Sequence, residues 1–158
     1  MWQAIWSLTI PCKVKNLVLK ATKNSLPTKK NLVKREIITR DSCELYHDHQ
    51  EDVKYALYLC SKLYELWNKV PIWNHRSLKQ VSTFVDLWGC IFAKNKDPAL
   101  FSMVIWALWN HQNNLRLGKF TGTLDQLLSQ VRDRLCEFAL HNTSMIALIV
   151  LQPQASNL

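Results

Sequence analysis

The stretch from Cys43 to Cys60 contains the densest set of metal-binding residue types in the chain. It reads CELYHDHQEDVKYALYLC, with a cysteine at each end, two histidines and several acids. Thiolates and imidazoles are the ligands that zinc prefers, and a structural zinc site arranges four such donors in a tetrahedron. The residue types therefore indicate a zinc site, with Cys43, Cys60 and either His47 or His49 as donors.

The spacing of the donors argues against a complete site. Zinc knuckles usually supply a close cysteine pair and then, at a distance, a histidine and a cysteine, whereas the inner positions here are Tyr46 and Tyr55. A phenol is a poor ligand near neutral pH because its unperturbed pKa is about 10. Two interpretations stay open: a rearranged site of Cys43, Cys60 and either His47 or His49, or two small buried cysteines beside surface histidines. Under both, we expect zinc binding to be weak or absent.

All of the net charge lies in the first quarter of the chain. Residues 1–40 hold nine basic side chains and one acid, Glu36, which gives +8, and the remaining residues sum to zero. Such asymmetry is typical of a segment that meets RNA, DNA or another polyanion, and the alternative is a solvated lysine-rich surface. The residues expected to contact phosphates, without sequence specificity, are Lys13, Lys15, Lys20, Lys29, Lys30, Lys34 and Arg35.

The cysteine pattern favours an intracellular protein of the nucleus or cytoplasm. Five cysteines are scattered along the chain, and no basic stretch followed by an apolar region marks a signal peptide. The most apolar run, residues 145–151, has seven residues, against roughly 20 needed to span a bilayer. We expect reduced thiols, no membrane and a buried C-terminal segment.

The scarcity of glycine, at three residues, and of proline, at five, predicts a mostly α protein. Pro11 and Pro27 divide the first 40 residues into three short helices, and apolar residues recur at helical intervals over 78–92, 100–117 and 124–141. Gly118 should cap the second of these three. The second N-terminal helix should bury Val14, Leu17, Val18 and Ala21, and the third Leu32 and Val33. We expect three parts: a small domain at 1–70, a helical segment at 71–142, and an apolar segment with a tail at 143–158.

Seven tryptophans raise the question of base stacking, because exposed aromatic rings beside lysines can stack on single-stranded bases. Trp73, in the connection beside His75 and Arg76, is the candidate for such a role. The other six lie on apolar helical stripes and are expected in the core: Trp2, Trp6, Trp67, Trp88, Trp106 and Trp109.

The acids of the chain do not predict an enzyme. Nucleic-acid polymerases and ribonucleases that use two metal ions need clustered carboxylates, and the one adjacent acidic pair here is Glu51 and Asp52. No Gly-rich phosphate loop and no serine in a nucleophile elbow occurs either. We expect a non-catalytic protein.

Residues 2–70 resemble the zinc-binding domain of the reverse-transcriptase polyproteins of plant non-LTR (LINE-type) retrotransposons. The matching positions are Trp2, Ile5, Trp6, Pro11, Lys13, Val14, Lys15, Ala21, Asn24, Leu26, Pro27, Thr28, Asn31, Leu32, Arg35, Cys43, Glu51, Leu57, Cys60 and Trp67. The segment IWALWNHQNNLRLGK is similar to the Trp-rich region that precedes ribonuclease H in those polyproteins.

The resemblance implies a small helical domain with a zinc knuckle whose ligands correspond to Cys43, Tyr46, Tyr55 and Cys60. Two of these four have departed from the family's pattern, so the knuckle is degenerate. The expected function is that of a retroelement fragment that binds nucleic acid weakly through its basic N-terminal face. The alternatives are a helical scaffold or protein-interaction module, and a decayed reading frame without function.

Overall fold

The structure is a computed structural model, and it describes residues 1–43, 47 and 49–151. The described part is helical and contains no β-strand, which confirms a mostly α protein. Its eight α-helices are α1 (Trp2–Ser7), α2 (Cys12–Thr22), α3 (Lys29–Lys34), α4 (Tyr64–Asn68), α5 (Arg76–Gln80), α6 (Phe84–Ala93), α7 (Pro98–Arg116) and α8 (Leu124–Leu151). A π-helical turn, η1 (Tyr55–Leu59), and a 3-10 turn, η2 (Ser61–Leu63), lie between α3 and α4.

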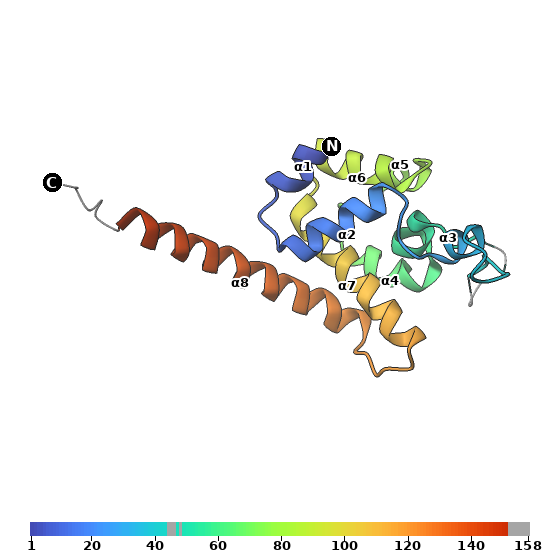
Figure 1. The fold of residues 1–158 in the computed structure, drawn as a ribbon. Helices are drawn as coiled ribbons and strands as arrows, with labels where there is room; N and C mark the ends of the chain where they lie inside the picture. Colours follow the sequence, from blue (N-terminus) through green and yellow to red (C-terminus); the bar gives the residue numbers. More distant parts are fainter. Residues whose placement is uncertain (44–46, 48, 152–158) are drawn as a thin grey trace.

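Helix α7 is the centre of the fold. It packs against α2, α6, α8 and η1, and Figure 1 shows it behind α2 with α8 passing below. The buried apolar residues among the described ones, from Ile5 to Val131, form one continuous cluster. Residues 1–70 thus share a core with the later helices, and the division of the chain at residues 70 and 142 stays a prediction.

The ends of α7 are set by local chemistry. Asp97 adopts a left-handed conformation and its side chain accepts a hydrogen bond from the backbone of Leu100 at 3.1 Å, while Pro98 opens the helix. At the other end Gly118 has φ +67°, and the next amide, Lys119 N–H, donates to the Asn114 carbonyl at 2.9 Å. This is the Schellman arrangement, so the predicted cap at Gly118 is confirmed.

One predicted helix between residues 71 and 97 differs from the structure. The single helix expected over 78–92 is wrong, because α5 ends at Gln80 and α6 begins at Phe84. Thr83 and Asp86 form a capping box, in which each side chain accepts from the other residue's backbone amide. Such a box starts a new helix, and its Thr-x-x-Asp pattern was readable in the sequence.

The C-terminal apolar run is not buried. Residues 145–151 continue α8, and the large apolar side chains in this run are between 47% and 77% exposed. Figure 1 shows why: α8 extends well past the other helices, so its distal half has no surface to pack on. The prediction of a buried segment is wrong.

By length and composition alone, α8 could cross a membrane. An 18-residue window in it has mean hydropathy 1.3, and none of that window is buried. Its proximal half, however, buries Leu127, Leu128 and Val131 and carries charges at Arg132, Asp133 and Arg134. The part of α8 without Asp, Glu, Lys or Arg runs from residue 138 to residue 151 and covers about 21 Å at 1.5 Å per residue.

Candidate nucleic-acid interface and knuckle region

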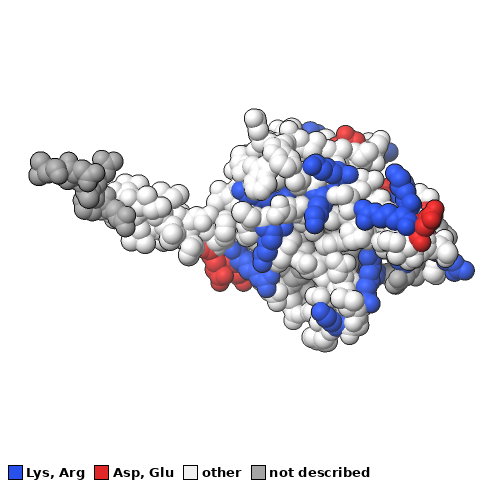
Figure 2. Space-filling model, in the orientation of Figure 1, with Lys and Arg blue, Asp and Glu red and all other residues white. Residues whose placement is uncertain are grey.

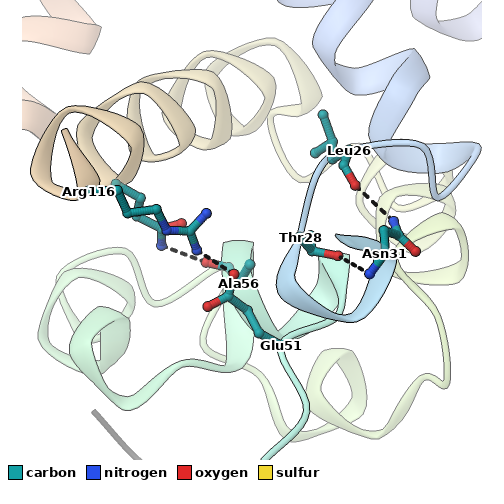
Figure 3. A network of polar contacts seen from close by, with 7 residues as sticks. Leu26, Thr28, Asn31, Glu51, Ala56 and Arg116 are labelled. Atoms are coloured by element: carbon teal, nitrogen blue, oxygen red, sulfur yellow. Dashed lines mark hydrogen bonds and ion pairs between the residues drawn. The ribbon is translucent and has the colours of Figure 1, made fainter. Parts of the chain in front are cut away.

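The turn between α2 and α3 is held by the side chain of Asn31. Asn24 takes a left-handed conformation with φ 51° after the end of α2. The buried Asn31 amide donates to the Asn24 carbonyl at 2.9 Å and to the Leu26 carbonyl at 2.8 Å. Thr28, fully buried, caps α3 by accepting from the Asn31 backbone (Figure 3). The relative orientation of the two basic helices is therefore fixed by a few polar contacts.

Glu51 connects α3 and the start of the knuckle to α7. Its amide donates to the Asp41 carbonyl at 2.8 Å, and its carbonyl accepts from Lys30 N–H at 3.2 Å. Its side chain, 8% exposed, forms an ion pair with the Arg116 guanidinium from the last turn of α7 (Figure 3). A charge in so sheltered a place needs a partner, which Arg116 provides across 65 positions of sequence.

Tyr55 occupies the space between the two knuckle cysteines. Cys43 and Cys60 are both buried. The pKa of the Tyr55 hydroxyl is raised by burial and by hydrogen bonds and charge from both thiols. Burial also raises the pKa of the Cys60 thiol, against a smaller opposing effect of Lys62. The hydroxyl is therefore placed to link the two thiols by hydrogen bonds, and burial favours the protonated form of the Cys60 thiol.

The described residues do not fit a zinc ion. Zinc binds thiolates, and the described part of the chain brings no three His, Cys, Asp or Glu side chains together as a metal site. His47 is exposed, and the exposed His49 stacks on the Tyr55 ring at a centroid distance of 5.5 Å. The predicted trio of Cys43, His47 and Cys60 thus stays a prediction without a formed site, and Tyr46 lies outside the described residues.

A cavity of about 150 Å³ opens beside the two thiols. Its walls include Tyr55, Glu51 and, from α7, His111, Gln112 and Arg116. Burial, with a smaller contribution from Lys62, lowers the pKa of His111. The Gln112 amide donates to the Ala56 carbonyl at 2.7 Å, so α7 supports the π-helical turn as well as Glu51.

The residues predicted to contact phosphates lie on α2 and α3 or directly after them. Figure 2 shows Lys and Arg side chains spread over the face that carries these helices, with acidic side chains in a few small groups toward its margins. Lys13, Lys20, Lys30, Lys34 and Arg35 are exposed, and Lys15 and Lys29 are half-buried. Leu32 and Val33, expected in the core, are only partly buried, and Asn31 is the buried residue of α3.

The structure reverses the predicted roles of three tryptophans. Trp73 is fully buried: its indole N–H donates to the Lys96 carbonyl at 2.7 Å and its ring packs edge-on against Phe101. It cannot stack on a base, so that prediction is wrong. Trp2 and Trp6, expected in the core, are instead 52% and 38% exposed. Trp67, Trp88 and Trp109 are buried as predicted, and Trp106 is partly buried.

Residues 1–67 match the family model for zinc-binding in reverse transcriptase. The match supports a reverse-transcriptase zinc-binding domain in this part of the chain. Comparisons with curated proteins and with solved structures gave no match. The matched segment ends at Trp67, whose ring lies against Trp73 and Phe101 at centroid distances of 5.8 Å.

The reverse-transcriptase zinc-binding match ends before several side chains that the fold uses. Arg116 and Gln112 support the matched segment from α7, and no local pattern in the sequence marks them.

Inside the matched segment, Lys54 is buried, and its ammonium donates to the Lys79 and Val81 carbonyls at the end of α5. Burial lowers the pKa of Lys54, partly offset by nearby carboxylates. Lys54 follows two acids in the sequence, and nothing in this pattern predicts that its side chain is buried.

Proposed function

We propose that the chain is a non-catalytic fragment of a retroelement reverse-transcriptase polyprotein that binds nucleic acid through its N-terminal basic face. The carrying observation is that residues 1–35 contain no acid, while the exposed cations of α2 and α3 are held in a fixed relation by Asn31. A basic surface with few acids attracts phosphates without reading sequence. The match over residues 1–67 supports the retroelement origin.

The same proposal includes the loss of zinc binding. Its support is the chemistry of the pocket: two thiols with a tyrosine hydroxyl between them, and a Cys60 pKa that favours the protonated thiol. A lost metal site would leave the basic face in place, because the contacts that orient α2 and α3 lie in the Asn31 turn and not at the cysteines.

The basic face is tested by measuring the affinity for a fluorescently labelled RNA at several salt concentrations. We expect the affinity to fall steeply between about 50 and 200 mM salt. Lysines and arginines that bind phosphates release the counterions condensed on the nucleic acid, and added salt opposes this release. The triple variant Lys20→Ala, Lys34→Ala and Arg35→Ala removes three exposed charges from the face. It should lower the slope of log K against log salt by about two to three units, roughly one for each lost phosphate contact.

A matched control removes the same charge elsewhere. Lys94, Lys119 and Arg132 are exposed and lie outside the first 40 residues, so their combined replacement by alanine should leave the salt slope close to that of the parent. An affinity indifferent to salt, or equal losses in the two triple variants, would contradict the proposal.

The second candidate function is a helical scaffold or protein-interaction module. One observation favours it: the distal half of α8 exposes Met145, Ile146, Leu148, Ile149, Val150 and Leu151 in a continuous run. Exposed apolar surface of this extent usually marks a contact with another molecule. Unchanged RNA binding in the α2–α3 triple variant would favour this candidate over the first.

A further inference from the structure

Two tryptophans on α1 form an exposed aromatic pair, although a tryptophan normally gains much by burial. Trp2 and Trp6 are one helical turn apart, with ring centroids 6.0 Å apart and planes inclined by 57°. Ile5 between them is fully buried and anchors α1 to the core. The helix thus presents the two indoles outward from a fixed base.

Lysines from α2 and its C-terminal end lie over these rings. The Lys15 ammonium is 5.6 Å from the centroid of the Trp6 ring and donates to the Trp6 carbonyl at 3.0 Å. The Lys23 ammonium is 5.1 Å from the centroid of the Trp2 ring. Each exposed indole therefore has a cation at its face, in a segment that contains no acid before Glu36.

We propose that Trp2 and Trp6, with Lys15 and Lys23, form a stacking site for single-stranded nucleic acid. The proposal rests on the nucleic-acid binding proposed above and adds that the ligand is single-stranded rather than duplex. Indole rings stack on the faces of unpaired bases, and neighbouring lysines reach the phosphates between them. A duplex would bind only by its phosphates, because its base faces are already covered by their neighbours.

Two other surfaces with similar residue types fit this ligand less well. Lys13 lies 4.5 Å from the Trp106 ring centroid, but that ring is partly buried and the groove beside it also holds Glu137. A carboxylate in the groove opposes a polyanion. Lys79 lies 5.4 Å from the centroid of the exposed Tyr64 ring, but among the described residues no second aromatic ring pairs with it. The Trp2–Trp6 pair offers two adjacent rings, in a segment of sequence without an acid before Glu36.

A membrane surface is the competing ligand for tryptophans beside lysines. Interfacial helices insert a continuous apolar face, whereas α1 has six residues and its Ile5 side chain is committed to the core. The two indoles alone offer little to insert. The observations therefore favour the nucleic acid, and vesicle binding becomes an outcome of the test.

The experiment measures fluorescence anisotropy of a labelled oligothymidylate of about 12 nucleotides and of a duplex of the same length. Trp2→Ala and Trp6→Ala should each weaken single-strand binding by about 5- to 150-fold, from the range for loss of one base stack, and leave duplex binding unchanged. Phe120→Ala removes an aromatic side chain that is 99% exposed and should change neither affinity. Circular dichroism checks that each variant folds.

The outcomes separate this inference from the function on which it rests. Single-strand affinity that survives both tryptophan changes, while the α2–α3 triple variant still weakens binding, would overturn the stacking site and keep the basic face. Equal losses for single strand and duplex would also overturn it. Absence of any nucleic-acid binding would overturn both proposals, and binding of the parent protein to anionic phospholipid vesicles, lost in the tryptophan variants, would assign the pair to a membrane instead.

Discussion

Among the polar contacts between the matched segment and α7, the ion pair of Glu51 with Arg116 should lose the most stability when one partner is replaced. Replacing Arg116 by methionine keeps much of the side-chain volume and removes the charge. The Glu51 side chain, 8% exposed, then keeps its carboxylate in a sheltered site without its cation. Removing one partner of a fully buried pair costs about 3–5 kcal/mol.

The expected cost is smaller here because the pair is not fully buried. The Arg116 side chain is 29% exposed, and the cavity of about 150 Å³ beside it can admit water to the carboxylate. We expect Arg116→Met to lower the free energy of unfolding by about 2–3 kcal/mol. Glu51→Gln should cost less, because the remaining guanidinium can turn toward solvent, and the double variant should cost less than the sum of the two.

Urea unfolding followed by far-ultraviolet circular dichroism gives these free energies, provided that the transition is two-state. The three variants and the parent form a double-mutant cycle, whose coupling free energy we expect at about 1–2 kcal/mol. Arg132→Met, an exposed change on α8, should stay within about 0.5 kcal/mol of the parent. A cost below about 0.5 kcal/mol for Arg116→Met, or additive costs in the cycle, would refute a buried charge at Glu51.

Three other side chains, Tyr58, Asn31 and Tyr55, give predictions for stability. Burial raises the pKa of Tyr58 to about 12, so its contribution to stability is complete below about pH 10, where the phenol is also neutral in the unfolded chain, and is lost as the pH rises toward 12. Tyr58→Phe should flatten that fall in stability, and a parent whose stability is constant over this range would contradict it. Asn31→Ala removes the donor to two turn carbonyls and should cost about 1–3 kcal/mol in urea unfolding, whereas a neutral result would show that water replaces the amide. Tyr55→Phe should lower the free energy of unfolding by about 1 kcal/mol. Metal analysis of the parent protein should find no zinc, and a chelator should not change its unfolding. One zinc per chain would refute the proposed loss of zinc binding.

Helical periodicity located most of the elements but not always the side that faces the core. In α2 the pattern has one apolar stripe, and Val14, Leu17 and Val18 lie on the buried face as it predicts. Helix α1 has only six residues, and around its axis the side chains of Trp2 and Trp6 lie about 60° and 100° from Ile5, both on the same side of it. Periodicity cannot choose between two such faces in so short a helix, and the core receives Ile5.

Long-range contacts decide the residues that local reasoning places wrongly. Trp73 is followed by polar residues in sequence, yet it is buried because its ring packs on Phe101 of α7 and its indole N–H reaches the Lys96 carbonyl. Arg116 gives no signal for the same reason: its partner Glu51 lies in a different segment. No window of neighbouring residues contains either contact, whereas Gly118 and the Asn31 turn depend on nearby residues and are marked in the sequence.

The knuckle region shows how a matched segment can keep its arrangement if zinc is lost as proposed. A structural zinc site can supply on the order of 10 kcal/mol at one point, and no single contact in this region equals that. The stabilisation is instead distributed: Tyr55 links the two thiols, Asn31 closes the α2–α3 turn, and Arg116 neutralises Glu51. Two of these three contacts lie within residues 1–67, and the third comes from α7, which also buries the inner face of α2. A zinc-independent fold of the matched segment therefore depends on α7, and this dependence explains why the buried cluster continues past residue 67 without a break.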